Sequence, residues 1–188
     1  TTIWGIVRNR IARLNTDKSL DTSFNLDPNG SIYAIAVEPD GQILVWWAYT
    51  TIWGIARNRI SRFNSDGTID TSFNPDANFT VSTIALQSDG NIIIWGDFTT
   101  VWGTARNRIA RVSSTWLLDT SFNPSVSWTV NTIVLQTNEQ ILIGGVFTGV
   151  WGTARNRIAR VSSTWLLDTS FNPSVSWTVS TIAIQSDG

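Results

Sequence analysis

Four arginine–aspartate pairs are the residues whose types and spacing could do chemistry. An Arg-Asn-Arg-Ile-x-Arg segment recurs every 49 residues, and an aspartate follows its last arginine by eight residues each time. The guanidinium fork suits a carboxylate or phosphate, so the arginines could hold an anionic ligand or pair with the aspartates. We favour the pairing, and expect Arg111→Ala to loosen the outer strand of its repeat. The predicted ion pairs involve Arg13, Arg62, Arg111 and Arg160 with Asp21, Asp70, Asp119 and Asp168.

Tryptophan is the second candidate, with 11 residues in 188. One set precedes a glycine at the 49-residue spacing: Trp4, Trp53, Trp102 and Trp151. A second set lies in other loops of the last two repeats: Trp116, Trp128, Trp165 and Trp177. Aromatic loops can bind sugars or protein partners, because a rigid ring buries much area at little entropic cost. For the first set we favour the other hypothesis, that each tryptophan packs under its own loop and seals neighbouring repeats. Trp46 and Trp47 are predicted to fill space at a junction.

Composition excludes several functions. The chain lacks histidine and cysteine, which removes the usual general base, thiolate metal sites and disulfides. Its net charge of −1 does not favour a nucleic-acid partner, and no apolar run is long enough for membrane insertion. Acidic residues stand singly, whereas calcium needs six to eight oxygens. We therefore predict no enzyme activity, no metal and no cofactor.

The pattern within one repeat predicts an all-β fold. Residues 81–87 alternate as a strand does, Ser88-Asp89-Gly90 is a turn signal, and residues 91–98 form a β-branched apolar run. Residues 106–112 are predicted as a third strand and residues 117–123 as a shorter fourth. Four strands in 49 residues are typical of a β-propeller blade; a right-handed β-solenoid is the alternative.

The repeat phase divides the single array into units of approximately 1–31, 32–80, 81–129 and 130–178, with a partial unit at 179–188. About four blades result, the first and last incomplete, with a lone first strand predicted at 179–185. Ring closure within the chain would leave a blade without an internal strand and with unpaired edges. The chain is therefore expected to be an excerpt of a longer propeller or to join with copies of itself, two copies giving eight blades.

Three segments resemble the delta-60 repeat family of β-propellers: Thr104 to Arg111, Leu118 to Pro124 and Ser88 to Ile94. The resemblance covers essentially the whole chain and implies a propeller fold in a bacterial secreted or cell-surface setting. It implies no catalytic activity. The chain departs from the family pattern where Asn-Gly or Asp-Gly loops are replaced by tryptophan, as at Trp102-Gly103.

The leading functional hypothesis is a structural or interaction scaffold that displays aromatic loops and assembles with copies of itself or neighbouring repeats. A lectin-like module with one shallow tryptophan-lined sugar site per repeat is the alternative, with avidity from repetition. A designed or reconstructed propeller without a ligand is a third hypothesis, because residues 101–130 and 150–179 are identical.

Overall fold

The computed structural model describes residues 2–113, 115–162 and 166–185, with only the backbone described at Tyr33 and Trp47. These residues form β-strands and connecting loops without any helix. The described part of the chain accordingly contains no helix long and apolar enough to cross a membrane. The all-β prediction is confirmed.

Three antiparallel sheets, each a three-stranded meander, contain most of the strand residues. We call them the first, second and third blades, and they have the strand orders β3-β4-β7, β8-β9-β12 and β13-β14-β17. The first blade consists of β3 (Ile32–Val37), β4 (Ile43–Trp47) and β7 (Ile60–Phe63); the second of β8 (Val81–Leu86), β9 (Ile92–Gly96) and β12 (Ile109–Val112); the third of β13 (Val130–Leu135), β14 (Ile141–Gly145) and β17 (Ile158–Val161).

A small two-stranded hairpin lies between the second and third strands of every repeat, in a region that the sequence predicts as a plain loop. The hairpins are β1 (Thr2–Ile3) with β2 (Ile6–Val7), β5 (Thr51–Ile52) with β6 (Ile55–Ala56), β10 (Thr100–Val101) with β11 (Thr104–Ala105), and β15 (Gly149–Val150) with β16 (Thr153–Ala154). Trp-Gly occupies the two-residue turn of each. The third strand starts only at Ile109, since Arg108 has a positive φ of 67°.

Two predicted strands are absent. The fourth strand at 117–123 is reduced to a single bridge between Val112 and Leu118, because Asp119 and the serine two residues later form a turn instead of an extended ladder. The lone strand predicted at 179–185 forms no ladder either, although Val179 N–H donates to Gly145 O at 3.1 Å. Residues 11–14, which correspond to β7, also lie outside any strand.

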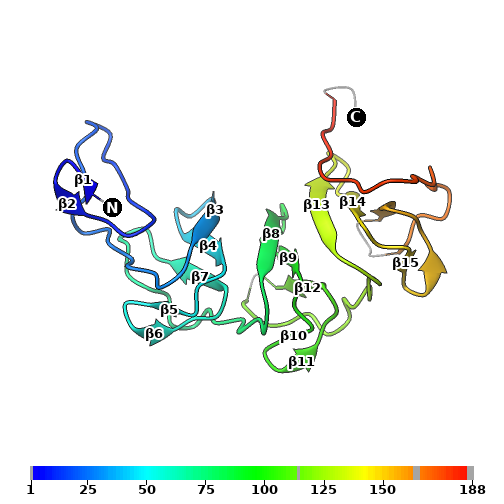
Figure 1. Ribbon diagram of the computed structural model, residues 1–188, viewed down its shortest axis with the longest axis horizontal. Coiled ribbons are helices and arrows are strands. Elements are labelled where there is room, and N and C mark those ends of the chain that lie inside the picture. Colours follow the sequence, from blue (N-terminus) through cyan, green and yellow to red (C-terminus); the bar gives the residue numbers. More distant parts are fainter. Residues whose placement is uncertain (1, 114, 163–165, 186–188) are drawn as a thin grey trace.

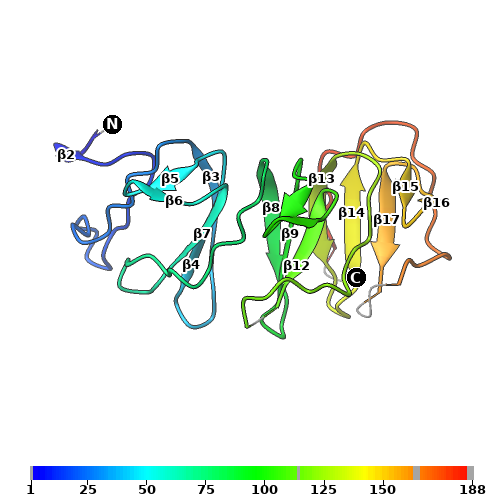
Figure 2. The same cartoon turned by 90° about the horizontal axis from the view of Figure 1, so that it is seen from below.

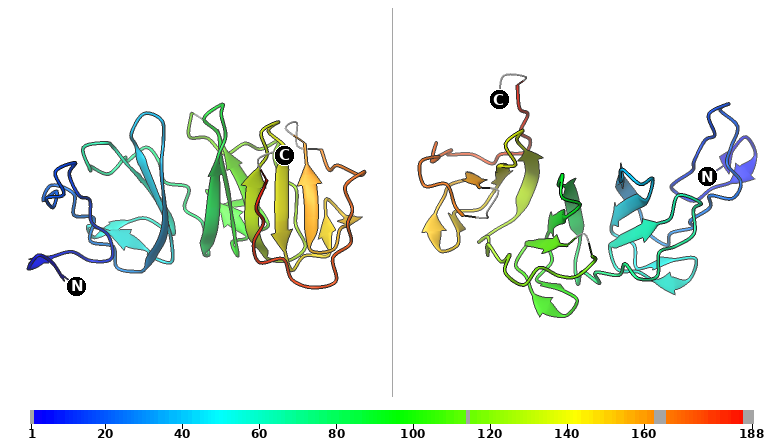
Figure 3. Two further views of the ribbon diagram at one scale, coloured as in Figure 1. Left: turned by 90° about the horizontal axis from the view of Figure 1, so that it is seen from above. Right: turned by 180° about the vertical axis from the view of Figure 1, so that it is seen from behind.

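The blades stand side by side along an open arc (Figure 1). The first strands β3, β8 and β13 line the concave side, and the hairpins lie toward the convex side (Figure 1). Seen from below, β8, β9 and β12 stand beside β13, β14 and β17 (Figure 2). The N-terminal repeat and the C-terminal segment form two separate tips, which the view from behind shows equally (Figure 3, right).

The hydrophobic core lies in the seams between adjacent repeats. Ile92 and Ile94 of β9 pack toward the first blade, and Ile93 and Trp95 pack toward the third. This two-sided burial explains why the second strand of each blade is a continuous apolar run. Each blade therefore needs a neighbour on both faces to bury its apolar side chains.

Candidate functional site

The third arginine of each repeat contacts the aspartate eight residues later, as the sequence predicts. Arg13 Nε donates to Asp21 Oδ2 at 2.7 Å, and Arg111 Nε donates to Asp119 Oδ2 at 2.7 Å. The corresponding distance from Nε is 2.8 Å in the remaining two repeats, where the pairs are Arg62–Asp70 and Arg160–Asp168. All four predicted pairs are thus brought together.

Two further contacts complete this unit. The second aspartate oxygen accepts from the backbone N–H and hydroxyl of the serine two residues on, at 2.9 and 2.6 Å for Ser23. The guanidinium lies over the phenylalanine that follows this serine, with Arg13 Cζ 4.7 Å from the Phe24 ring centroid. The Arg-x7-Asp-Thr-Ser-Phe pattern therefore encodes one compact Arg–Asp–Phe unit per repeat.

Hydrogen bonding keeps these aspartates ionised. The Ser23 hydroxyl, and then Arg13, lower the pKa of Asp21 to about 2. Burial opposes ionisation of Asp70, but hydrogen bonds from Ser72 and Arg62 more than offset it, and its pKa is also lowered. A lowered pKa means that the contribution of the aspartates to stability is present above pH ~4 and is lost as the pH falls toward 2.

The Arg–Asp–Phe unit also faces the next repeat along the chain. Arg13 Nη1 donates to Ser65 O at 2.6 Å, and Arg62 Cζ lies 3.1 Å from the Trp116 ring centroid. Ser65 and Trp116 both belong to the turn that follows the third strand of the next repeat. The same turn therefore makes each of these two inter-repeat contacts, which sequence reasoning missed because the partners are about 50 residues apart.

One position of this turn differs between repeats. Lys18, Gly67 and Trp116 are equivalent, and all three have a positive φ, of 69°, 91° and 66°. Trp116 packs against Phe73 with ring centroids 5.5 Å apart, and the Arg62 side chain is only 3% exposed. Arg13, opposite Gly67, is 28% exposed. Arg62 beneath Trp116 is thus covered more completely than Arg13 opposite Gly67.

The tryptophans of the Trp-Gly set form hairpin turns. Each has a φ near 50° and precedes a glycine whose φ is also positive, as type I′ turns require. Trp102 and Trp151 are half-buried against the blade cores, whereas Trp4 is 66% exposed and Trp53 39% exposed. Trp53 Nε1 also donates to Asn25 O.

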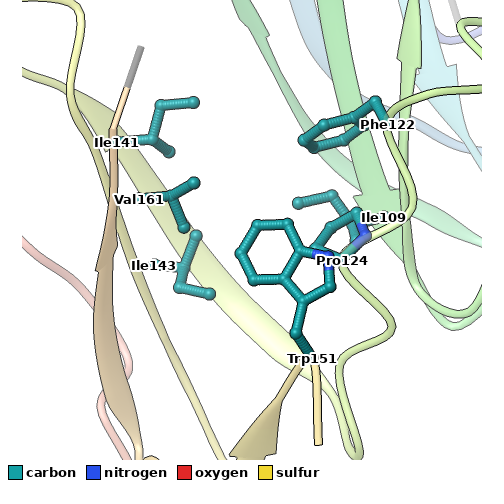
Figure 4. A pocket seen from close by; sticks show the side chains of 7 residues that line it. All are labelled: Ile109, Phe122, Pro124, Ile141, Ile143, Trp151 and Val161. Atoms are coloured by element: carbon teal, nitrogen blue, oxygen red, sulfur yellow. The ribbon is translucent and has the colours of Figure 1, made fainter. Parts of the chain in front are cut away.

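Trp151 shows how a turn tryptophan seals a seam (Figure 4). Its indole points between Ile141, Ile143 and Val161 of the third blade and Phe122 with its neighbours in the second repeat (Figure 4). The remaining cavity measures about 10 Å³ and is lined by apolar residues. This volume is at the lower limit for a single water molecule, so Trp151 acts as packing here.

The second tryptophan set divides differently. Trp128 and Trp177 are 59% and 85% exposed, Trp116 is half-buried in a seam, and Trp165 lies outside the described residues. Sequence reasoning missed Phe79, which occupies the repeat position of Trp128 and Trp177 and is 54% exposed. Aligning the repeats by position would have identified this row.

The first arginine of each triplet is buried and donates to the backbone, as Arg106 Nη1 does to Ala105 O at 2.7 Å.

Of the predicted Trp46–Trp47 pair, Trp46 is buried and donates to Ser82 O at 3.3 Å across the first seam. The Trp47 side chain lies outside the described part. Within the described residues, no group of three acidic, histidine or cysteine side chains could hold a metal ion.

The stacked meanders and repeated seams define a β-propeller repeat array. Comparison with protein families gives a match to the family described as "Domain of unknown function (DUF5122) beta-propeller" over residues 1–24, 38–73, 87–122 and 136–171. The chain belongs to this family, which is the same kind of repeat family as the delta-60 repeats, so that resemblance is confirmed. A comparison with curated proteins finds no match.

Proposed function

We propose that the chain is a non-enzymatic interaction scaffold that associates through its blade faces with copies of itself or with neighbouring repeats. An extracellular or cell-surface setting is part of this proposal, and it follows from the family resemblance alone. The repeat architecture supports the proposal, since a blade must bury both faces against neighbours.

One observation carries the proposal. Leu14 is 52% exposed, whereas the residues at its repeat position, Phe63, Val112 and Val161, are 0%, 0% and 4% exposed. Ile35 and Val37 of the adjoining strand β3 are 54% and 61% exposed. These side chains line one open pocket with Ile11, Ala12 and Arg13, between the N-terminal repeat and the first blade. Such a surface favours association with another blade.

The test is the mass of the native particle by light scattering over a range of concentrations. We expect a defined oligomer larger than the 20.8 kDa chain. Leu14→Glu should weaken association, because it places a charge on the surface to be buried. Leu117→Glu is the matched control, since Leu117 is 68% exposed and lies in the turn that follows β12 of the second blade. A monomer at every concentration would contradict self-association.

A carbohydrate-binding rim is the second candidate, and the row of Phe79, Trp128 and Trp177 favours it. Each ring is more than half exposed, and the three occupy one repeat position. Exposed aromatic faces can stack on sugar rings, and repetition would add avidity. Glycan binding by the chain and its loss in a Trp128→Ala, Trp177→Ala variant would support this function. A folded monomer that binds no glycan would favour a propeller without a ligand.

A further inference from the structure

The turn after the third strand contacts the Arg–Asp–Phe unit of the preceding repeat at two successive seams, once by a hydrogen bond and once by a cation–π contact. Asn64–Thr68 meets Arg13 and Phe24 of the preceding repeat, and the turn that contains Trp116 meets Arg62 and Phe73. In both cases the turn closes over an Arg–Asp–Phe unit. Because the contact recurs between repeats, we expect another turn and another Arg–Asp–Phe unit of the same sequence pattern to bind each other in the same way.

The N-terminal repeat presents a turn of this kind with its side chains exposed. Asn15 N–H donates to Ser19 O at 2.9 Å, and Lys18 N–H donates to Asn15 O at 2.9 Å. Asn64 and Thr68 form the equivalent first bond at 2.8 Å, and Gly67 donates to Asn64 O at 2.9 Å. Residues 15–19 are all exposed. The turn is thus already in the conformation that docks elsewhere in the chain.

The opposite tip presents an Arg–Asp–Phe unit beside an open crevice. Arg160 pairs with Asp168 at 2.7 Å and lies over the Phe171 ring at 4.8 Å. The crevice measures about 560 Å³, and Leu142 and Ile184 also line it. The pocket beside Arg13 and Phe24, between the N-terminal repeat and the first blade, measures about 270 Å³. The Arg160 side chain is 26% exposed, which is close to the 28% of Arg13 beside Asn64–Thr68 and well above the 3% of Arg62 beneath Trp116.

We propose that the turn Asn15–Ser19 of one copy docks on the Arg160–Asp168–Phe171 unit of a second copy, head to tail. Thr16 O then takes the place of Ser65 O as acceptor for the arginine, and Asp17 takes the place of Asp66. A second copy is the expected partner, because the chain carries both halves of this contact. The turn and the receiving unit match a turn and a unit that already contact each other inside the chain. This inference rests on the proposed scaffold function and names its interface.

The shape of the arc fits this docking. Both tips point to the same side of the arc (Figure 1). Rotating a second copy by 180° in the plane of that view brings the N-terminal tip of each copy to the C-terminal tip of the other. A head-to-tail contact that closes after two copies gives a ring with two identical junctions, whereas one that does not close gives a filament. Discrete dimers are therefore the expected species.

Lys18→Trp provides the first test, because it copies Trp116 opposite Arg62. A cation–π contact in a desolvated seam strengthens association, so we expect the dimer dissociation constant from light scattering to fall about tenfold or more. The gain should disappear when Arg160→Ala is added. Trp128→Phe is a control that changes an exposed aromatic residue outside the junction. An equal gain with and without Arg160 would overturn the proposal.

Disulfide trapping provides the second test, since the chain has no cysteine of its own. A Cβ added at Gly67 would lie 3.7 Å from Phe24 Cα, so the two positions are in direct contact. The intrachain control is therefore Phe24→Cys with Gly67→Cys, and the intermolecular pair is Lys18→Cys mixed with Phe171→Cys. We expect a covalent dimer only in the mixture.

The two readouts separate the two proposals. Oligomers by light scattering without the Lys18–Phe171 crosslink, while the intrachain control forms, would overturn head-to-tail docking and leave the scaffold function standing. Monomers throughout, with no crosslink, would overturn both. A crosslinked dimer of the expected pair, together with a tightened Lys18→Trp dimer, supports docking at this site.

Discussion

Arg62 of the first blade lies against Trp116 in the turn that follows the second blade's β12, with the Arg62 Cζ 3.1 Å from the indole centroid. The guanidinium also donates to Asp70 and lies 3.7 Å from Glu38 Oε2. One arginine therefore joins the outer turn of its own blade to the turn of the next. The seam between these blades contains charge and aromatic surface as well as aliphatic packing.

Trp116→Gly should destabilise the protein by about 2 kcal/mol. The variant loses the cation–π contact and the edge contact with Phe73, together with the burial of a half-buried ring. Relief of the left-handed backbone at this position offsets about 1 kcal/mol of that loss. Urea unfolding measures the difference, and Trp128→Phe, which copies Phe79, should change it by less than about 0.5 kcal/mol. Unchanged stability in Trp116→Gly would show that the contact contributes nothing.

Alanine at the third arginine should destabilise the three blades in order of burial. Arg62, Arg111 and Arg160 have side chains 3%, 15% and 26% exposed. Arg62→Ala leaves Asp70 and Glu38 buried without their cation, so we expect a loss of about 3 kcal/mol. Arg160→Ala should lose least, since solvent screens its pair, and Arg111→Ala should fall between. Urea unfolding of the three variants would contradict this ranking if the losses were equal.

The 49-residue period and the Arg–Asp spacing predict the architecture well, because both depend on contacts within one repeat. Residues 81–87 and 91–98 become β8 and β9 almost as predicted, since hairpin pairing is local. The predicted strand at 117–123 fails because its Asp–Thr–Ser segment forms a side-chain-capped turn. Asp119 therefore serves the turn and the ion pair together, which alternation alone does not reveal.

The contacts between repeats could not be predicted from the sequence. Nothing local indicates that Trp116 covers Arg62, because the two residues meet only after adjacent blades stack. Packing is the favoured hypothesis for this tryptophan set, and Trp102 and Trp151 do pack into seams, whereas Trp4 is 66% exposed. Burial of a loop residue depends on the neighbouring blade, so sequence could place the turn but could not decide its exposure.

Asparagine in place of the turn tryptophan should have opposite effects in two repeats. Trp4 is 66% exposed with a φ of 49°, so Trp4→Asn should stabilise the hairpin by about 0.5 to 1 kcal/mol, because Asn-Gly is the preferred type I′ pair. Trp53 packs edge-on against Phe63 with centroids 6.0 Å apart. Trp53→Asn should therefore lose about 1 to 2 kcal/mol. Thermal unfolding of both variants compares them, and a gain in both would mean that Trp53 packing is unimportant.

Glu38→Gln should stabilise the protein in a pH-dependent way. Glu38 is buried at the position of Gln87 and Gln136, and burial raises its pKa above 4.5, although Arg62 acts in the opposite direction. Below pH 4.5 the carboxyl group is protonated in the folded and unfolded chains, so variant and wild type should unfold at similar temperatures. As the pH rises from about 4.5 toward the raised pKa of the folded state, the carboxyl group ionises in the unfolded chain first, and the wild type loses stability.

The melting temperature of Glu38→Gln relative to wild type should therefore increase from about pH 4.5 and level off once Glu38 is ionised in the folded state. Thermal unfolding between pH ~3.5 and ~8 measures this difference. Glu139→Gln is the comparison variant, because it makes the same change at a half-buried glutamate outside the strands, where the side chain accepts a hydrogen bond from Ser88. An advantage of Glu38→Gln that does not change with pH would show that packing, and not ionisation of the buried carboxyl group, accounts for it.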